Sequence, residues 1–401
     1  MTIACPDCGT LEELPQLTRS EVARCPICEA QLERANDRSV TAALACSVAT
    51  FGLLFPANLL PLMRVDVLGI VRETYIWSSV ARLGANQWVI LALFTMLFAM
   101  VLPLLRFGLL SLVLGSARLG LRPSWMGRAF RWATRLDMWA MPDVFLVGCF
   151  VGYSRISASM PVTIEAGGYC FIAAAILCMI TRAVMERRIV WRAIAPERDA
   201  PEDEQAISCT VCAYVMPADA EGTDCPRCGQ RLRARKPDAK RRTLALVIAG
   251  YLLYIPANVY PMSSDIRLGQ TTEHRIIDGI AELFHAGLWP LGILIFFTSI
   301  AVPLLKLAGM SWFLASVRRR SSRHLVARTR LYRLITEVGR WSNVDVFTVA
   351  VFVPLLQFGV INQTRVNIGS TAFLLVVVLT MIASRGFDPR LMWDEGLPDR
   401  D

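Results

Sequence analysis

The chain is a tandem duplication, and this constrains its fold more than any other feature. Four short segments of the first half recur in the same order in the second half, at offsets of 200 to 202 residues. The matched segments are Cys25-Pro26-Ile27-Cys28 with Cys225-Pro226-Arg227-Cys228, Pro56-Ala57-Asn58-Leu59-Leu60-Pro61 with Pro256-Ala257-Asn258-Val259-Tyr260-Pro261, Pro103-Leu104-Leu105-Arg106 with Pro303-Leu304-Leu305-Lys306, and Asp143-Val144-Phe145 with Asp345-Val346-Phe347. Four matches in one order are not expected by chance, so the fold must contain two copies of one unit.

Apolar residues are gathered in runs long enough to cross a bilayer. Hydrophobic residues make up 54% of the chain and charged residues 19%, with a mean hydropathy of +0.45, whereas soluble domains carry about 25% charged residues. A helix of about 20 residues spans the hydrocarbon core. Eight runs stand out, at residues 41–63, 87–114, 142–156, 168–185, 243–262, 289–316, 344–360 and 369–385. The sequence therefore predicts an all-α polytopic membrane protein with about eight transmembrane helices, four in each repeat.

The positive charge predicts an orientation in the membrane. The formal net charge is +9, and 32 of the 42 lysines and arginines lie in segments on the N-terminal side of the spans, against 7 in the opposite loops. Cytoplasmic loops carry such an excess of positive residues. We therefore expect both termini in the cytoplasm, and no nucleic-acid partner.

Eight of the twelve cysteines form two metal-binding patterns. One set has the spacing C-x2-C-x16-C-x2-C and the other C-x2-C-x12-C-x2-C, which is the spacing of a four-thiolate zinc ribbon. The ligands are Cys5, Cys8, Cys25 and Cys28 in the first set, and Cys209, Cys212, Cys225 and Cys228 in the second. Each ribbon is too short to form an adequate core, so a metal must stabilise it. We predict two zinc ions, one per ribbon; iron remains an alternative because the ligand set does not separate the two metals.

These features divide the chain into four parts. A cytoplasmic zinc ribbon and a four-helix membrane module form each repeat. The boundaries are 1–38 for the first ribbon, 39–190 for the first module, 191–238 for the second ribbon, and 239–401 for the second module with a short cytoplasmic tail. On the opposite side of the membrane, partial alternation predicts short hairpins at 64–75 and 264–275, and an amphipathic helix at 277–285.

Charged residues within or beside the apolar runs define a candidate site. Such groups are costly in a bilayer, at about 2.5–3.5 kcal/mol on insertion scales. We expect Lys306 to pair with Asp345 in the second repeat, and Arg106 to pair with Asp143 in the first. For the pair in the first repeat, we expect a structural role in fastening helices, with a working role as the alternative.

The second repeat adds hydroxyl groups to this site. Three of its positions carry a hydroxyl where the first repeat has alanine or cysteine. They are Ser299, Ser342 and Thr380, opposite Ala99, Ala140 and Cys178. Polar side chains rarely face lipid, so the sequence predicts that the second repeat carries a transport or proton path, with a helix-packing network as the alternative.

A proline-asparagine motif closes the first apolar run of each repeat. Proline lacks the backbone donor, so it is expected to bend or end the helix, and the asparagine side chain is expected to satisfy a carbonyl that is set free. The residues are Pro56, Asn58 and Pro61 in the first repeat, and Pro256, Asn258 and Pro261 in the second. A structural helix end and a gating kink are both compatible with this pattern.

Together, these motifs resemble the paraquat-inducible protein A family. The likeness covers the paired ribbons, the repeated motifs above and the closing segment Phe387-Asp388-Pro389-Arg390-x-x-Trp393-Asp394. It implies a Gram-negative inner-membrane protein with tetraspanin-like membrane modules, paired with a periplasmic MCE-domain protein. It also implies a role in moving phospholipids between the inner and outer membranes. The segment Arg187–Arg192, after the fourth run, departs from the closing pattern.

The resemblance and the residues favour lipid transport over two alternatives. These are a stand-alone secondary transporter for small molecules or ions, and a redox- or metal-sensing membrane protein. The chain contains no G-x-x-x-x-G-K-[ST] phosphate loop and shows no nucleophile–base constellation. We therefore expect neither an ATP-driven pump nor an enzyme.

Overall fold

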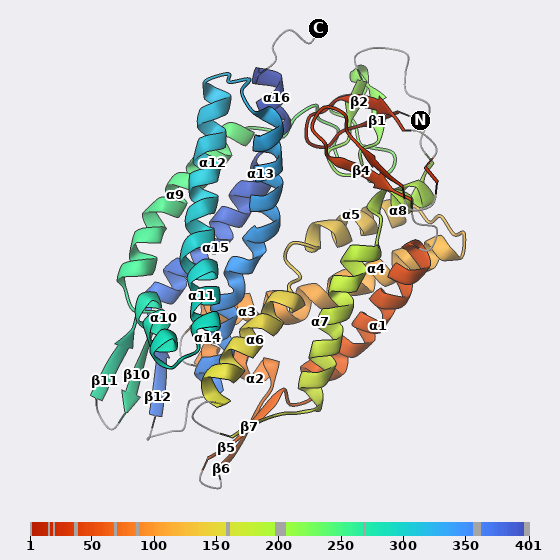
Figure 1. Cartoon of the computed structure of the whole chain (residues 1–401). Helices are drawn as coiled ribbons and strands as arrows, with labels where there is room; N and C mark the ends of the chain where they lie inside the picture. The colour runs from red at the N-terminus through yellow and green to blue at the C-terminus, as the bar shows by residue number, and fades with distance from the viewer. Residues whose placement is uncertain are drawn as a thin grey trace.

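The molecule consists of two helical bundles side by side, with two small ribbons at one end (Figure 1). The computed structural model describes residues 2–14, 17–18, 21–35, 39–67, 70–85, 88–157, 161–196, 206–267, 270–355 and 362–396. The first bundle belongs to the first repeat and the second bundle to the second repeat, as the duplication predicts. The opposite end of each bundle carries a small sheet (Figure 1).

Corresponding helices build the two modules. In the first module they are α1 Ser39–Leu59, α2 Ile76–Ala85, α3 Val89–Thr95, α4 Leu102–Arg118, α5 Met126–Leu136, α6 Pro142–Ser157, α7 Ala166–Val184 and α8 Arg187–Ile194. In the second they are α9 Ala239–Val259, α10 Ile276–His285, α11 Trp289–Ile295, α12 Val302–Arg318, α13 Leu325–Val338, α14 Val344–Leu355, α15 Ile368–Gly386 and α16 Arg390–Gly396. Helix α1 packs against α4 and α7, and α9 packs against α12 and α15 in the same way.

Six helical segments of the described chain are long and apolar enough to cross a membrane. They are Val40–Leu59, Val89–Arg118, Ala166–Val184, Ala239–Val259, Trp289–Arg318 and Ile368–Gly386. Each lies in one of the eight predicted runs, so the chain is a multi-pass membrane protein. The third and seventh runs form the shorter helices α6, with 16 residues, and α14, with 12. At about 1.5 Å per residue these are shorter than the roughly 30 Å hydrocarbon core. Residues 356–360 of the seventh run lie outside the described residues.

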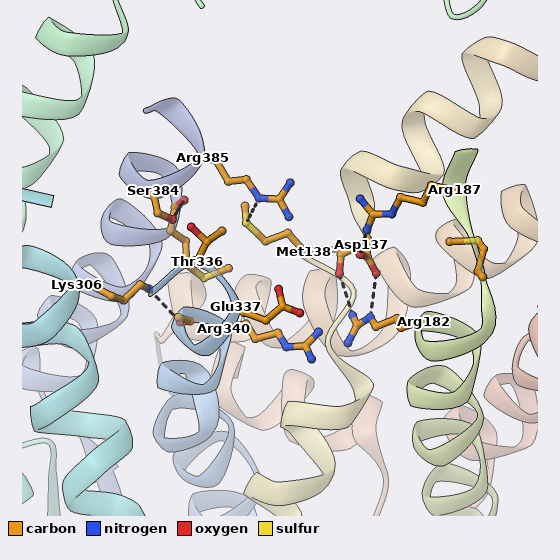
Figure 2. A pocket seen from close by; sticks show the side chains of 13 residues that line it. Asp137, Met138, Arg182, Arg187, Lys306, Thr336, Glu337, Arg340, Ser384 and Arg385 are labelled. Carbon is orange, nitrogen blue, oxygen red and sulfur yellow. Dashed lines mark hydrogen bonds and ion pairs between the residues drawn. The ribbon is translucent and has the colours of Figure 1, made fainter. Parts of the chain in front are cut away.

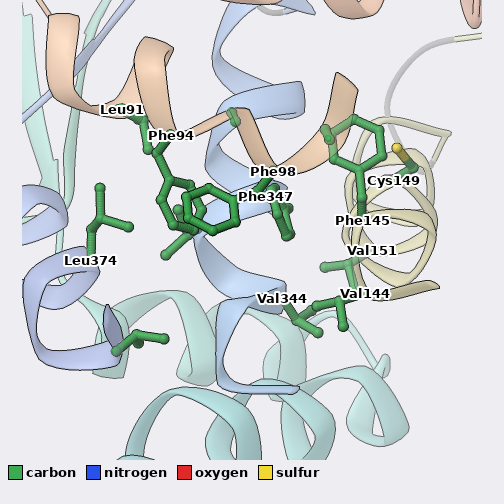
Figure 3. Close-up of a cluster of buried hydrophobic side chains, with 14 of the residues drawn as sticks. Leu91, Phe94, Phe98, Val144, Phe145, Cys149, Val151, Val344, Phe347 and Leu374 are labelled. Carbon is green, nitrogen blue, oxygen red and sulfur yellow. The ribbon is translucent and has the colours of Figure 1, made fainter. Parts of the chain in front are cut away.

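The two short helices join the modules at the centre of the molecule. Phe145 of α6 and Phe347 of α14 have ring centroids 5.3 Å apart, within a buried apolar cluster to which both repeats contribute (Figure 3). Gly148 allows the close approach, because a Cβ there would lie 2.9 Å from the Cβ of Phe347. The duplicated Asp-Val-Phe motif therefore marks the seam between the repeats.

Each of the two 30-residue spans, Val89–Arg118 and Trp289–Arg318, contains a π-helical turn that the sequence analysis did not predict. The turns are η1 Met96–Val101 and η3 Phe296–Ala301, directly before Pro103 and Pro303. Proline has no N–H to donate to the carbonyl four residues earlier. The preceding residue, Leu102 or Val302, instead donates to a carbonyl five residues back. The Pro-Leu-Leu motif thus sets the rotation, about the helix axis, of the segment on which Arg106 or Lys306 lies.

Small antiparallel sheets lie at the end opposite the ribbons. Both predicted hairpins form, as β5 Met63–Val67 with β6 Ile70–Thr74 and β10 Ser263–Arg267 with β11 Gln270–His274. The chain between α6 and α7 adds a third strand to the first sheet, β7 Val162–Ile164, and the chain between α14 and α15 adds β12 Asn362–Val366 to the second. The amphipathic helix predicted at 277–285 is α10, and α2 is its counterpart. The chain is therefore mostly helical, as predicted, with short strands in the predicted hairpins and in the ribbons.

Helices α1 and α9 both end within the proline-asparagine motif, at Leu59 and Val259. Pro56 and Pro256 lie inside α1 and α9. The amide of Asn58 donates to the Leu54 carbonyl at 2.6 Å, and that of Asn258 to Tyr254 at 2.8 Å. These are not the carbonyls four residues before the prolines, so the predicted compensation was wrong in detail. The amides cap the last turn before Pro61 and Pro261.

The buried core of each ribbon packs on the module of the other repeat. The first ribbon has strands β1 Thr2–Ala4, β2 Leu11–Glu13, β3 Val22–Arg24 and β4 Gln31–Arg34, and the second has β8 Ala206–Ser208, β9 Val215–Pro217 and the 3-10 turn η2 Ala218–Ala220. The first ribbon shares a buried cluster with Phe313 and Trp393 of the second module. The second ribbon shares one with Phe130 and Trp191 of the first. Each ribbon therefore buries its core against the module of the other repeat, and not against the module that follows it in the sequence.

Candidate functional site

The eight motif cysteines form two buried four-thiol clusters. In each cluster the four sulfur atoms lie within 4.8 Å of one another. The Sγ–Sγ distances are 3.4 Å for Cys5–Cys28 and 3.5 Å for Cys212–Cys225. A tetrahedral Zn²⁺ with Zn–S bonds of about 2.3 Å requires sulfur atoms about 3.8 Å apart. Both clusters can therefore hold one metal ion, as the spacing predicted.

Tight turns bring the sulfur atoms together. The residue after each Cys-x-x-Cys pair has a positive φ, at 80° for Gly9, 57° for Glu29, 55° for Ala213 and 64° for Gly229. Each of these residues donates its N–H to the carbonyl of the first cysteine of its pair, at 2.7 to 3.0 Å. Glycine adopts this conformation without the steric cost that a side chain carries. Only two of the four turns, those at Gly9 and Gly229, therefore carry glycine, the residue that this conformation favours.

A cationic side chain of the second module reaches the cysteine cluster of the first ribbon. Arg333 of α13 donates to the Asp7 carboxylate at 2.6 Å and to the Cys28 carbonyl at 2.9 Å, and it lies 3.7 Å from the Cys28 sulfur. A guanidinium stabilises thiolates, which are the metal-binding form. Burial raises the pKa of Asp7, and Arg333 acts against this shift. The module thus stabilises the ribbon through charge as well as apolar contact.

Metal analysis of the purified protein is expected to give about two ions per chain, most of them zinc. Replacing Cys225 with serine is expected to lower the content by about one, because a structural site needs all four ligands. The matched control is Cys46→Ser, which removes a cysteine outside both clusters. An unchanged metal content in Cys225→Ser would contradict the assignment of the second cluster.

Lys306 is buried, and its contacts differ from those we predicted. Its exposed fraction is 1%. The ammonium donates to the Gly339 carbonyl at 3.0 Å and to the Thr380 hydroxyl at 3.2 Å. The expected ion pair with Asp345 was wrong, because the loop between α13 and α14 brings a carbonyl and not a carboxylate to the ammonium. Gly339 permits this contact, since a Cβ there would lie 2.5 Å from Lys306 Cε.

The three hydroxyl residues of the second repeat are all buried, and two of them join the lysine. Ser342 donates to the Gly339 carbonyl at 2.8 Å, so it shares its acceptor with Lys306. Thr380 accepts from Lys306 and donates to the Val377 carbonyl at 2.9 Å. Ser299 lies in the π-helical turn, and its hydroxyl has no hydrogen-bond partner among the described residues. Asp345 is 8% exposed and lies one turn beyond Ser342.

The first repeat replaces this hydroxyl network with ion pairs. Arg106, predicted to pair with Asp143, instead lies 2.6 Å from Asp137. Asp143 pairs with Arg182 at 2.6 Å, and Arg340 of the second repeat lies 3.7 Å from the same oxygen. The prediction was wrong because the loop between α5 and α6 places a second carboxylate nearer to Arg106.

Asp137 is the centre of this ion-pair network. It contacts Arg106 at 2.6 Å, Arg182 at 2.9 Å and Arg187 at 2.6 Å. Burial alone would raise the pKa of Asp137, but these three guanidinium groups hold it well below its usual range. The carboxylate is therefore ionised at all physiological pH values, and it pairs with cations from three helical segments.

Sequence reasoning missed two positions that decide the difference between the repeats. At the offset of 202, Asp137 corresponds to Gly339 and Arg182 corresponds to Ser384. One carboxylate and one guanidinium of the first repeat are thus absent from the second. A comparison of the repeats at this offset, both before and after each Asp-Val-Phe motif, would have found the two exchanges.

Comparison with known proteins gives the same two-repeat pattern. The model of the family described as paraquat-inducible protein A matches residues 40–195 and again residues 241–396. The chain is 30% identical over 407 residues to the intermembrane transport protein PqiA of Escherichia coli K12, covering 98% of this chain and 95% of that protein. It is 29% identical over 394 residues to the lipophilic envelope-spanning tunnel protein A of the same strain, covering 97% and 90%.

A relative from another organism is similar over the same length, whereas no solved structure matches. The chain is 27% identical over 410 residues to the probable intermembrane transport protein of Haemophilus influenzae, covering 98% of this chain and 95% of that protein. The family matches fall at equivalent positions of the two repeats and together cover most of the chain. The chain therefore belongs to the paraquat-inducible protein A family.

Proposed function

We propose that this protein is the inner-membrane component of a lipid transport system that works with a periplasmic MCE-domain protein. In this role it loads or extracts phospholipids for transfer between the inner and outer membranes. The observation that carries the proposal is the similarity to proteins named for intermembrane transport, which extends over 98% of this chain. The family model also matches each of the two membrane modules, at residues 40–195 and 241–396.

The asymmetry between the repeats supports a division of labour. In the first module, Asp137 and Asp143 hold Arg106 and Arg182 in a closed network of ion pairs. In the second, the ammonium of Lys306 is held by neutral acceptors alone. Lysine can release its proton when buried, whereas arginine stays charged. We infer that Lys306 changes its contacts during transport while the first module serves as a fixed frame.

The arginine distribution supports an orientation with both termini and both ribbons in the cytoplasm. The small sheets then lie in the periplasm, where an MCE-domain partner would be located. In intact cells, an impermeant thiol reagent is expected to label a cysteine introduced at Glu73, which is exposed on β6, and not one introduced at Glu13 on β2. Labelling of position 13 from outside the cell would contradict the orientation.

Genetic complementation tests the proposed function. In a strain that lacks the protein and shows an envelope-lipid defect, Lys306→Met is expected to reduce complementation to the level of the empty vector. Lys306→Arg is expected to fail as well, because it keeps the charge but not the exchangeable proton. Arg106→Lys is the matched control, and it should complement because a lysine there can still pair with Asp137.

The measurement is made at equal amounts of protein in the membrane, with analysis of the phospholipids in both membranes. Full complementation by Lys306→Arg would show that Lys306 is a fixed charge that fastens helices. A strain whose membranes keep their normal lipid distribution without the protein would refute the role in lipid transport.

A further inference from the structure

A cavity of about 340 Å³ lies between the two modules, beside Lys306 (Figure 2). Both repeats line it. The first repeat contributes the segment after α5 and the end of α7, and the second contributes α12, α13, the 3-10 turn η4 Gly339–Asn343 and the end of α15. The cavity therefore lies where movement of one module against the other would change its shape.

The lining of this cavity carries more positive than negative groups. Five cationic side chains face two carboxylates, those of Asp137 and Glu337. The cationic residues are Arg182, Arg187, Lys306, Arg340 and Arg385. Arg182 and Arg187 share the single negative charge of Asp137, so they leave a smaller excess on the first-repeat side. The second-repeat side has three cations and one carboxylate, Glu337, so the larger excess of positive charge lies there.

The three second-repeat cations lack a carboxylate of their own. Lys306 donates to a carbonyl and a hydroxyl. The Nε of Arg385 donates to the thioether sulfur of Met138 at 3.0 Å, which is a weak acceptor. Arg340 lies 3.7 Å from one carboxylate oxygen of Asp143. The same oxygen is only 2.6 Å from Arg182. The buried Nε of Arg340 has no partner among the described residues. An anion would supply the acceptors that these groups lack.

The position of the cavity indicates what kind of anion it meets. Arg182 and Arg385 lie within two residues of the ends of α7 and α15, at Val184 and Gly386. These are the arginine-rich ends of the spans, and a helix of about 20 residues that crosses the hydrocarbon core places its ends near the lipid headgroups. Basic pockets between transmembrane helices at this depth bind anionic headgroups, and guanidinium groups match phosphate oxygens in a two-pronged geometry.

The remaining wall suits the apolar part of the same molecule. The thioether side chains of Met138, Met185 and Met381 line the cavity beside the cationic groups. Methionine adapts its shape to an irregular apolar partner. A free phosphate ion would gain nothing from these three side chains, whereas a phosphate that continues into glycerol and acyl chains would contact them.

We propose that the inter-module cavity is a binding site for the phosphate group of an anionic phospholipid. Arg340 and Arg385 contact the phosphate, and the three methionines contact the adjoining glycerol and acyl atoms. The inference rests on the proposed function, because it assigns the place where a transported lipid is held. It also explains why the second repeat lacks a counterpart of Asp137: a carboxylate there would compete with the phosphate.

The test measures binding to the purified full-length protein in detergent by isothermal titration calorimetry. The probes are short-chain phosphatidylglycerol, short-chain phosphatidylcholine and inorganic phosphate. The wild-type protein is expected to bind phosphatidylglycerol more tightly than either of the others. Equal affinity for the two lipids would overturn the proposal, and equal affinity for inorganic phosphate would show that the cavity takes the free ion only.

Two variants with opposite expected effects locate the site. Arg385→Gln is expected to weaken phosphatidylglycerol binding by at least about tenfold, because it removes a charge-assisted hydrogen bond. Glu337→Gln is expected to tighten binding by about two- to fivefold, because it removes a competing negative charge. Arg319→Gln, at an exposed position on the cytoplasmic side of α12, is the control for net charge. Equal loss in Arg385→Gln and Arg319→Gln would refute the site.

This experiment is independent of transport, because it uses the protein without a partner. Absent binding together with normal lipid distribution in complemented cells would reject the cavity and leave the proposed function in place. Specific binding in a protein whose loss leaves membrane lipids unchanged would support the site and reject the transport function.

Discussion

Replacing Asp137 with asparagine is expected to lower the free energy of unfolding of the protein by about 3–5 kcal/mol, because it removes one partner from a buried ion-pair network. The asparagine keeps the size of the side chain but loses the negative charge that Arg106, Arg182 and Arg187 share. Arg106 is the most affected, since its side chain is 1% exposed and cannot reach water. A lone charge in this position is worse than no charge at all.

Thermal unfolding in detergent, together with the amount of protein in the membrane, measures this effect. The matched control is Asp394→Asn, which breaks the ion pair with Arg235, where both side chains are more than a third exposed. Surface pairs of this kind contribute about 0–1 kcal/mol. A destabilisation of Asp137→Asn no greater than that of Asp394→Asn would show that the network is hydrated and contributes little.

The second large effect is expected at the contact between the second ribbon and the first module. A Cβ on Gly127 of α5 would lie 1.9 Å from the Arg227 carbonyl oxygen. This atom belongs to the backbone of the metal-binding loop, so no side-chain rotation relieves the clash. Gly127→Ala is therefore expected to displace the ribbon and to destabilise its docked state by about 1–3 kcal/mol or more.

Hydrogen exchange of residues 209–230 is the measurement that reports this displacement. Exchange is expected to become faster in Gly127→Ala, while the metal content stays the same because all four cysteines remain. Gly115→Ala in α4 serves as the control, since nothing lies within 4 Å of its added Cβ. Unchanged exchange in Gly127→Ala would show that the ribbon is not held against α5.

Each ribbon packs on the module of the other repeat, so these contacts connect the two halves of the molecule. The first ribbon is held by Arg333 of α13, and the second is held against α5, the counterpart of α13 in the other repeat. The two ribbons also contact each other through β1 and β9. Metal binding at the ribbons is therefore expected to stabilise the arrangement of the two modules, and not only the ribbons themselves.

Local patterns in the sequence determined the repeat, the six long spans and the metal ligands. Each of these depends on residues close together along the chain: a span needs only a continuous apolar run, and a zinc ribbon needs only its two cysteine pairs at the right spacing. The sequence also indicated that Ser342 and Thr380 belong with Lys306, because both are hydroxyl residues where the first repeat has alanine or cysteine.

The tertiary structure alone decided the partners of the charged residues and the exchange of the ribbons. Arg106 lies 31 residues before Asp137 and 37 before Asp143, and both carboxylates follow α5, so sequence distance could not choose between them. The path of the loop before α6 made that choice, and the corresponding loop brought the Gly339 carbonyl to Lys306. Because the two repeats have similar surfaces, a ribbon fits either module by local pattern. Which module it contacts depends on how the two modules meet at α6 and α14, a property of the whole fold.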